Sequence, residues 1–211
     1  MNIPNAASPV PPDTSGLEDE RREDNRHCTV FRIARIARES DAGLWRVRNI
    51  SDHGMMLATT VAVSPGEPLQ IALSDAITLV GKVVWARDGR CGVEFDTPVD
   101  ALDILRQLAA ERQSGDYRPP RLPVHGRALA VTEDGNHDVE IENLSQNGAG
   151  VIHGGGLETG TELLLVLGED IRRRGIVRWS RGDPQGIWRA GIWFAPPLAP
   201  GDLESIRRFQ S

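Results

Sequence analysis

Two six-residue stretches decide the fold that this sequence predicts: Asn49-Ile-Ser-Asp-His-Gly54 and Asn143-Leu-Ser-Gln-Asn-Gly148. They share the pattern Asn-x-Ser-x-x-Gly and lie 94 residues apart, since 143 − 49 = 94. Two more landmarks repeat in the same order: Gly81-Lys-Val-Val-Trp85 with Gly175-Ile-Val-Arg-Trp179 at the same offset, and Gly92-Val-Glu-Phe95 with Gly191-Ile-Trp-Phe194 at 99. Matched landmarks in order, with the extra length in one loop, indicate two copies of one small domain.

Short strands separated by turn signals fill the space between these landmarks. From Cys28 onward, apolar and polar residues alternate with an imperfect period of two, which is typical of strands. We expect strands at residues 28–38, 44–47, 55–60, 68–73, 77–85 and 91–95. Six short strands at roughly ten-residue spacing favour an all-β fold, either a small antiparallel barrel or a sandwich.

Leucines at helical spacing follow the first set of strands, between Asp100 and Arg112. They predict a helix that ends before Gly115, and a second helix is expected near residues 200–209. We therefore divide the chain into a disordered leader over residues 1–20, a first domain over 21–98, a helix and linker over 99–116, and a second domain over 117–211 with a C-terminal helix.

The charge of the chain argues against one class of partner. A formal net charge of −6 and a pI near 5.4 disfavour a nucleic-acid surface, which usually carries a basic stripe. An anion site must then be local. It would be built from arginine, because Lys82 is the only lysine in the chain, and arginine binds phosphate through a planar two-pronged fork.

The patterns of cysteine, histidine and hydropathy argue against a metal-binding, a disulfide-stabilised and a membrane-spanning protein. The two cysteines, Cys28 and Cys91, and the five histidines lack metal-ligand spacing, so we expect no metal site, no disulfide framework and histidines at the surface. The histidines are His27, His53, His125, His137 and His153. No apolar run approaches the roughly 20 residues of a membrane span, and no signal peptide is evident. We expect a cytoplasmic protein without membrane insertion.

The basic cluster Arg21-Arg-Glu-Asp-Asn-Arg26 stands where the leader gives way to the first strand. Arg21, Arg22 and Arg26 can close on one anion from several sides, and each charge-assisted hydrogen bond is worth roughly 1.5 to 3 kcal/mol. A ligand with two phosphodiester groups would use such a clamp well. The alternative is a solvated charge run in which the arginines pair with neighbouring acidic residues.

Asn49, Ser51 and Gly54 supply the polar groups of the repeated pattern. The Asn and Ser side chains either bond to neighbouring backbone or present an amide and a hydroxyl outward. Gly54 is expected to provide a positive φ. Such a turn can hold the edge of a planar base, and the alternative is a plain hairpin.

The order of these motifs resembles the PilZ domain. Arg22 and Arg26 match RxxxR, and Asn49, Ser51 and Gly54 match [D/N]xSxxG some twenty residues later. The glycine, tryptophan and phenylalanine landmarks follow near the domain end. The resemblance extends over residues 22–95 and, with an incomplete arginine motif, over residues 118–194.

The resemblance implies two six-stranded antiparallel β-barrels in tandem, each followed by a short α-helix, and binding of the bacterial second messenger cyclic di-GMP. In this family the arginines hold phosphates and guanine faces, while the Asn, Ser and Gly hold a guanine edge. The ligand often binds as a stacked dimer, over which the leader folds. The implied site consists of Arg21, Arg22, Arg26, Asn49, Ser51 and Gly54.

The second copy departs from the arginine motif. Aligning Arg121 with Arg26 places Tyr117 where the first arginine belongs and leaves Arg118 one position late. We expect this domain to bind weakly or not at all and to serve as a docking surface or dimerisation partner. A weak second site would consist of Arg118, Arg121, Asn143, Ser145 and Gly148.

The tryptophans are expected to have different roles. Trp85 and Trp179, together with Phe194, are predicted to lie in the barrel cores. Trp188 and Trp193 are additional in the second copy and belong either to the core or to a partner surface.

The residues favour a receptor over an enzyme, because no nucleophile is accompanied by an oriented base or a metal cluster. The main hypothesis is a cyclic di-GMP receptor or adaptor, without other cofactors, that changes conformation or partner binding to regulate motility, biofilm or exopolysaccharide output. Its protein partner is unknown and a homodimer is one expected form. The alternative is a nucleotide-independent interaction protein in pilus, flagellar or polysaccharide assembly. A third hypothesis is a hydrolase that uses His27 and Cys28.

Overall fold

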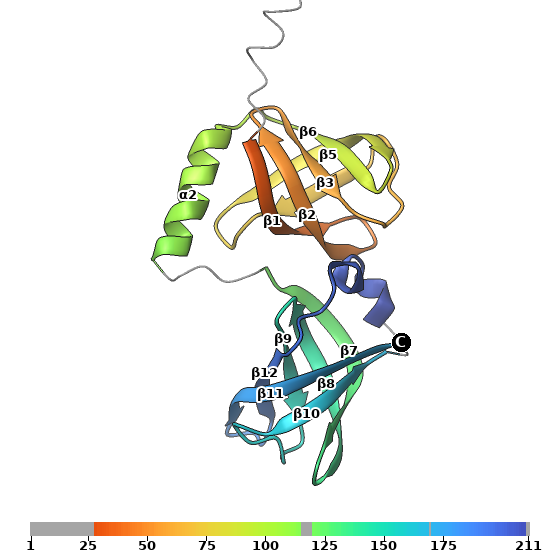
Figure 1. The fold of residues 1–211 in the computed structure, drawn as a ribbon, viewed down its shortest axis with the longest axis vertical. Helices are drawn as coiled ribbons and strands as arrows, with labels where there is room; N and C mark the ends of the chain where they lie inside the picture. The colour runs from red at the N-terminus through yellow and green to blue at the C-terminus, as the bar shows by residue number, and fades with distance from the viewer. Residues whose placement is uncertain (1–27, 115–119, 169, 210–211) are drawn as a thin grey trace, which may run out of the picture.

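The computed structural model describes residues 28–114, 120–168 and 170–209, without the side chains of residues 28–31 and 208. Over these ranges the strands form two closed six-stranded antiparallel barrels in tandem, and an α-helix follows the first barrel (Figure 1). The tandem barrels expected from the sequence are confirmed. No helix in the described ranges is long and apolar enough to cross a membrane.

The first barrel has the strand order β1-β2-β3-β6-β5-β4 and closes where β4 pairs with β1. Its strands are β1 (Cys28–Ala37), β2 (Ala42–Ser51), β3 (Gly54–Ala58), β4 (Pro68–Ala72), β5 (Thr78–Arg87) and β6 (Arg90–Phe95). Side chains of alternate residues, such as Val47, Leu57 and Val93, fill its interior. The order brings the outer faces of β2, β3, β6 and β5 side by side, and this surface carries the candidate site.

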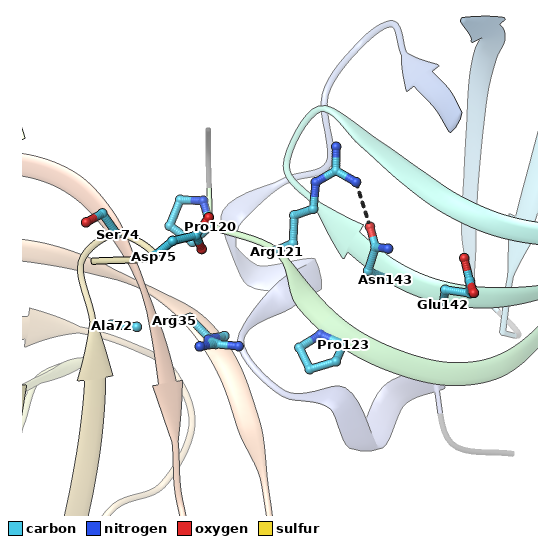
Figure 2. A pocket seen from close by; sticks show the side chains of 9 residues that line it. All are labelled: Arg35, Ala72, Ser74, Asp75, Pro120, Arg121, Pro123, Glu142 and Asn143. Atoms are coloured by element: carbon cyan, nitrogen blue, oxygen red, sulfur yellow. Dashed lines mark hydrogen bonds between the residues drawn. The ribbon is translucent and has the colours of Figure 1, made fainter. Parts of the chain in front are cut away.

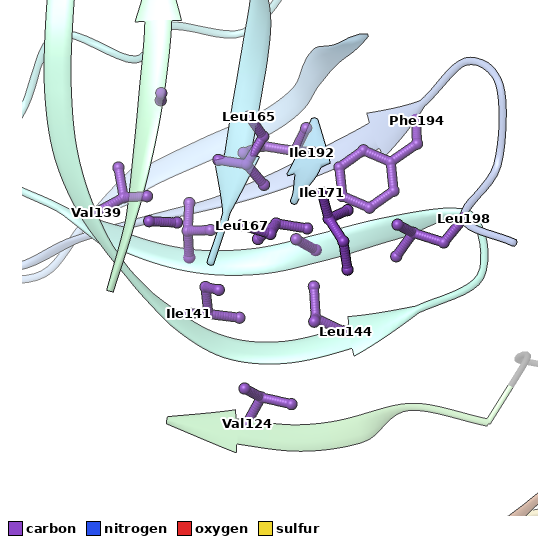
Figure 3. Close-up of a cluster of buried hydrophobic side chains, with 14 of the residues drawn as sticks. Val124, Val139, Ile141, Leu144, Leu165, Leu167, Ile171, Ile192, Phe194 and Leu198 are labelled. Atoms are coloured by element: carbon purple, nitrogen blue, oxygen red, sulfur yellow. The ribbon is translucent and has the colours of Figure 1, made fainter. Parts of the chain in front are cut away.

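The second barrel repeats the first strand for strand. Its strands are β7 (Leu122–Thr132), β8 (Gly135–Ser145), β9 (Gly148–His153), β10 (Glu162–Leu167), β11 (Ile171–Gly182) and β12 (Trp188–Phe194). Figure 3 shows its core, in which Phe194 lies among aliphatic side chains such as Ile171 and Leu198. Phe194 is fully buried, as the sequence predicts.

The helix α2 (Ala101–Gln113) covers the first barrel. Asp100 caps its start by accepting a hydrogen bond of 2.8 Å from the N–H of Asp103, as is common for a residue that precedes a helix. Ile104 and Leu108 bury their side chains in the core of the first barrel. Asp52, next to the Ser51 end of β2, accepts a hydrogen bond of 3.0 Å from the N–H of Ala101 and fixes the helix to that end of the barrel.

The α-helix predicted near residues 200–209 is wrong. Two four-residue 3₁₀ helices stand there, η1 (Pro200–Leu203) and η2 (Ile206–Phe209). At the break, the carbonyl of Glu204 accepts a hydrogen bond of 2.9 Å from Nε1 of Trp45 in the first barrel. The hydroxyl of Ser205 donates to the carboxylate of Asp41, at 2.7 and 2.9 Å. These groups bond to the first barrel, so the segment is a contact between domains and not a continuous helix.

The C-terminal segment lies between the two barrels in Figure 1. Its Leu203 and Phe209 belong to the core of the second barrel, and Leu44 of the first barrel packs into the same cluster. The carboxylate of Glu204 accepts hydrogen bonds from the N–H and hydroxyl of Thr60, at 2.6 and 2.5 Å. The segment therefore joins the barrels through both apolar and polar contacts.

Candidate functional site

A row of four residues crosses the outer face of the first barrel. Asn49 on β2 pairs with Met56 on β3. Met56 pairs in turn with Gly92 on β6, which faces Trp85 on β5. Both β2 and β5 are irregular immediately before this row, and such bulges redirect the side chains that follow them. Residues that are 36 positions apart in the sequence, at 49 and 85, thus lie in one cross-strand line.

Trp85 lies on the outside of the barrel. A Cβ atom on Gly92 would lie 2.1 Å from Nε1 of Trp85, so the indole occupies the space that a side chain at position 92 would fill. The indole is half-buried, and the guanidinium carbon of Arg87 is 5.3 Å from its ring centroid. The prediction that Trp85 belongs to the barrel core is therefore wrong. Both copies of the repeat contain a tryptophan followed by a glycine, Trp85 with Gly92 and Trp179 with Gly191. This repeated pair is the sequence feature that could have predicted the outer position of Trp85.

Asn49 and Ser51 lie within β2 and not in the turn that follows it. The Oδ1 of Asn49 accepts a hydrogen bond of 3.0 Å from the N–H of Met56, which fixes the amide and leaves its NH₂ group as a donor. The buried hydroxyl of Ser51 donates to the carbonyl of Gly54 at 3.2 Å. Both side chains thus bond to backbone, the first of the two options that the sequence left open.

Gly54 has a different role from the one predicted. It does not adopt a positive φ. A Cβ atom on it would lie 2.2 Å from the carbonyl oxygen of Val93, and one on Gly148 would lie equally close to the carbonyl oxygen of Ile192. The glycine of each motif is therefore required because two backbones approach closely there, and not because of a special dihedral angle.

A pocket of about 430 Å³ opens over this row. Asn49 and Trp85 line it together with the apolar side chains of Met56 and Val84. Its acidic member is Glu94, whose carboxylate is 3.3 Å from the ammonium group of Lys82. An indole, a thioether and a fixed amide donor suit a planar base with acceptors on its edge, such as guanine. The volume falls within the range of ligand pockets.

The predicted arginines Arg21, Arg22 and Arg26 lie outside the described residues. The described chain begins at Cys28, which pairs with Ile50. Ile50 directly precedes Ser51, so β1 begins beside the Ser51 end of the pocket.

The second barrel contains the same cross-strand row, except that Gly150 takes the place of Met56. Asn143 pairs with Gly150, Gly150 with Gly191, and Gly191 with Trp179. Trp179 is 38% exposed, so its predicted core position is wrong as well. Arg121 donates a hydrogen bond of 3.1 Å from Nη1 to Oδ1 of Asn143, which brings two predicted residues of the second site together.

The remaining residues of the second site divide into two groups. The hydroxyl of Ser145 donates to the carbonyl of Gly148 at 3.2 Å, as in the first barrel. Arg118 lies outside the described residues. The serine of the second motif therefore bonds as in the first, whereas Asn143 accepts from the Arg121 side chain where Asn49 accepts from the backbone of Met56.

A second cavity, of about 410 Å³, lies between the barrels (Figure 2). Arg35 lines it from β1, and Arg121 and Asn143 line it from the second barrel. Asp75 and Glu142 add carboxylates. The cavity is therefore lined by side chains of both charges. Arg121 and Asn143, two of the residues predicted for the second site, are among those that line it.

Among the histidines that the structure describes, His153 is buried, contrary to the expected surface position. It is 5% exposed, and burial is the main cause that lowers the pKa of its imidazole below the usual value; nearby His137 acts in the same direction. Its Nδ1 accepts a hydrogen bond of 3.1 Å from the N–H of Gly155, and its Nε2 is 3.3 Å from the hydroxyl of Ser180. No group of three or more potential metal ligands occurs in the described part of the chain.

Cys91 does not line the pocket of the first barrel. Cys91 is buried in the first core, and burial is the main cause that raises the pKa of its thiol to about 11. Glu67 adds to this increase and Arg38 opposes it. Such a thiol stays protonated and unreactive at neutral pH. His27 and the side chain of Cys28, the pair in the hydrolase hypothesis, lie outside the described residues.

Comparison with known proteins gives one family. A model of the PilZ domain matches residues 20–111 and again residues 116–210. No curated protein matches the sequence.

Solved structures with a similar course of the chain are remote in sequence. They include the Borreliella burgdorferi PlzA protein in complex with c-di-GMP, which is 13% identical, with 92% of this chain and 96% of that chain covered and a TM-score of 0.39. The K. pneumonia MrkH–c-di-GMP complex is 13% identical over 92% and 88% of the two chains, with a TM-score of 0.34. Escherichia coli YcgR in complex with c-di-GMP is 10% identical over 92% and 84%, also with a TM-score of 0.34.

Proposed function

This chain belongs to the PilZ domain family through both of its barrels, and we propose that it is a cyclic di-GMP receptor whose ligand site is the pocket of the first barrel. The observation that carries the proposal is the row from Asn49 to Trp85, which presents an amide donor and an indole on one open pocket. A guanine base packs its face against the indole of Trp85, and its O6 and N7 accept from the NH₂ group of Asn49.

Arg21, Arg22 and Arg26 bind the phosphates in this proposal. Arg26 precedes Cys28 by two residues, a separation that an extended chain covers in about 7 Å. Cys28 pairs with Ile50 next to Ser51, and this position of Cys28 supports the proposal that the arginines reach the pocket. A cyclic dinucleotide carries two phosphodiester charges, which bidentate guanidinium groups match.

Strand β2 links the ligand site to the contact between the barrels. Asn49 and Ser51 lie at its C-terminal end, while Leu44 and Trp45 near its start contact the C-terminal segment. Ligand binding that shifts β2 therefore changes how the barrels are held together. In the proposed cycle this change exposes or hides a surface for a protein partner in the cytoplasm, and so regulates motility, biofilm or exopolysaccharide output.

Calorimetry of cyclic di-GMP binding tests the proposal. Arg22→Ala and Arg26→Ala should each weaken binding at least tenfold, because each loses a charge-assisted contact worth roughly 1.5 to 3 kcal/mol. Arg172→Ala, which removes an exposed arginine outside the pocket, is the matched control and should bind like the wild type.

The competing hypothesis predicts a different result. A nucleotide-independent interaction protein would show no heat with cyclic di-GMP and no increase of its unfolding temperature in the presence of the nucleotide. That pair of negative results would reject the receptor.

A further inference from the structure

The second barrel carries an aliphatic surface on the outer side of β7, β10 and β11. Within these strands the side chains of successive residues point to opposite sides of the barrel wall. Ala130, Leu165 and Val177 point inward and are buried in the core. Their outward neighbours are half-buried and are not part of that core. We call the surface that these neighbours form the aliphatic face, and its residues are Leu129, Val131, Leu164, Val166 and Ile176.

Strand pairing places these side chains next to one another. Leu129 stands opposite Val166, and Val131 stands opposite Leu164. Ile176 continues the surface on β11, which pairs with β10 and lies beside it in Figure 1. The five side chains therefore form one patch. A contiguous apolar patch on the outside of a soluble domain marks a surface for a partner.

The first barrel has no such patch at the aligned positions, which lie 94 residues earlier. Three of its five aligned residues are exposed and polar, and the other two are alanines. The polar ones are Arg35 in place of Leu129, Gln70 in place of Leu164 and Lys82 in place of Ile176. The barrel therefore folds without aliphatic side chains on this face, and their presence in the second copy calls for a partner that covers them.

Opposite charges border the aliphatic face on its two sides. One row of paired residues crosses four strands, from Asp138 on β8 through Leu129 and Val166 to Arg172 on β11. Asp138 and Arg172 are both exposed. The row therefore reads acid, aliphatic, aliphatic, base from one side of the face to the other.

The acidic side of the face adjoins a hollow of about 770 Å³ on the outside of β7, β8 and β9. Asp138 and Glu140 line it with carboxylates, and its basic members include His125 and Arg127. Arg127 stands opposite Glu140, whereas Asp138 stands opposite Leu129. Asp138 is thus the carboxylate that borders the aliphatic face, and the hollow leaves room beside it for the guanidinium group of a partner.

This order of charges is complementary to itself. Two copies can lie face to face about a twofold axis that runs along the strands. Such an axis keeps each row in place and exchanges its two ends, so Asp138 of one copy meets Arg172 of the other while the aliphatic side chains meet in the middle. The same contact then occurs twice, as it does in every interface between two identical surfaces.

We propose that the aliphatic face is the surface through which two copies of this chain form a twofold dimer. Aliphatic packing in the centre supplies the affinity, and the two ion pairs between Asp138 and Arg172 set the orientation, because exposed ion pairs add specificity more than stability. The face shares no residue with the pocket of the first barrel. The proposal therefore does not depend on the ligand, and replacing Arg172 leaves the ligand pocket intact.

Sedimentation equilibrium of the full chain tests the dimer, at concentrations from low micromolar to several hundred micromolar and without nucleotide. We expect a reversible equilibrium between monomer and dimer. Leu129→Arg and Leu164→Gln introduce the aligned residues of the first barrel and should each weaken the dimer about tenfold or more, since a polar group is then buried against aliphatic side chains. Val80→Gln removes an aliphatic side chain that is 48% exposed on the first barrel, and this control should dimerise like the wild type.

A charge exchange tests the orientation. Asp138→Arg and Arg172→Asp should each weaken the dimer, because like charges then meet at both ends of the row. The double variant should regain the affinity of the wild type, a rescue that loss of folding cannot produce. A double variant that dimerises no better than either single one overturns the proposed pairing of the rows. A chain that stays monomeric at every concentration, or a dimer that Leu129→Arg and Leu164→Gln leave unchanged, overturns the proposal.

Discussion

The indole Nε1 of Trp45 donates a 2.9 Å hydrogen bond to the backbone carbonyl of Glu204, which lies 159 residues further along the chain. A Cβ atom on the neighbouring Gly43 would lie 2.0 Å from the same oxygen, so the first barrel leaves room for that carbonyl. The contact connects the strand of the proposed ligand site to the last segment of the second barrel. The hydrogen bond is therefore one of the contacts that hold the two barrels together.

Trp45→Phe removes the indole donor and keeps most of the buried ring. Because the carbonyl of Glu204 then loses this donor, we expect the free energy of unfolding to fall by about 1 kcal/mol. Denaturant unfolding measures this difference. Trp188→Phe, an exposed indole of the second barrel, is the control and should change stability by less. Equal stability of Trp45→Phe and wild type would show that the contact does not hold the barrels together.

Gly54→Ala should destabilise the first barrel by about 1 to 3 kcal/mol, because the new methyl group meets the backbone of Val93 at 2.2 Å and that strand cannot move aside. Gly154→Ala is the matched control, since a Cβ atom there meets nothing within 4 Å. Thermal unfolding of both variants compares them. A Gly54→Ala protein as stable as Gly154→Ala would contradict the close approach of β3 and β6.

The sequence predicts the strand pattern well because it follows from local alternation. The tandem repeat, the first helix and the two closed barrels all agree with it. The C-terminal helix was wrong because its backbone groups bond to Trp45, a partner 159 residues away that no local pattern reveals. Local periodicity thus predicts elements, and long-range hydrogen bonds decide whether a marginal helix remains continuous.

Asn49, Ser51 and Gly54 were chosen from the motif, and their role in ligand binding stays a prediction. All three line the pocket of the first barrel. The core positions predicted for Trp85 and Trp179 are wrong. Strand pairing places each of these two tryptophans opposite a glycine on the outer face of its barrel. This pairing depends on β-bulges, which the local sequence pattern does not predict.

The thiol of Cys91 should be unreactive in the folded protein. Its pKa of about 11 leaves almost no thiolate at pH 8, and its side chain is fully buried. In a Cys28→Ala background, which leaves Cys91 as the only cysteine, a thiol reagent should label the chain slowly at pH 8 and rapidly in guanidinium chloride. Fast labelling without denaturant would contradict the buried position.

Acid should destabilise the second barrel through His153. The folded pKa is lowered below the usual value of about 6.5, so below that pH the unfolded chain binds a proton that the folded chain does not. Stability is therefore expected to fall as the pH drops below about 6.5. His153→Asn should lose this part of the pH dependence in unfolding experiments at pH 7.5 and 5.5. The exposed His125→Gln should retain it, and identical pH dependence in both variants would reject the assignment.

The measurement that tests the central claim most directly is the indole N–H spectrum of the ¹⁵N-labelled chain during a titration with cyclic di-GMP. The signal of Trp85 is identified by its absence from the spectrum of Trp85→Phe. The account predicts that this signal shifts as the ligand binds, because the base packs against that indole in the pocket of Asn49. If calorimetry shows binding while the Trp85 signal stays in place, the ligand lies elsewhere and the proposed site is wrong.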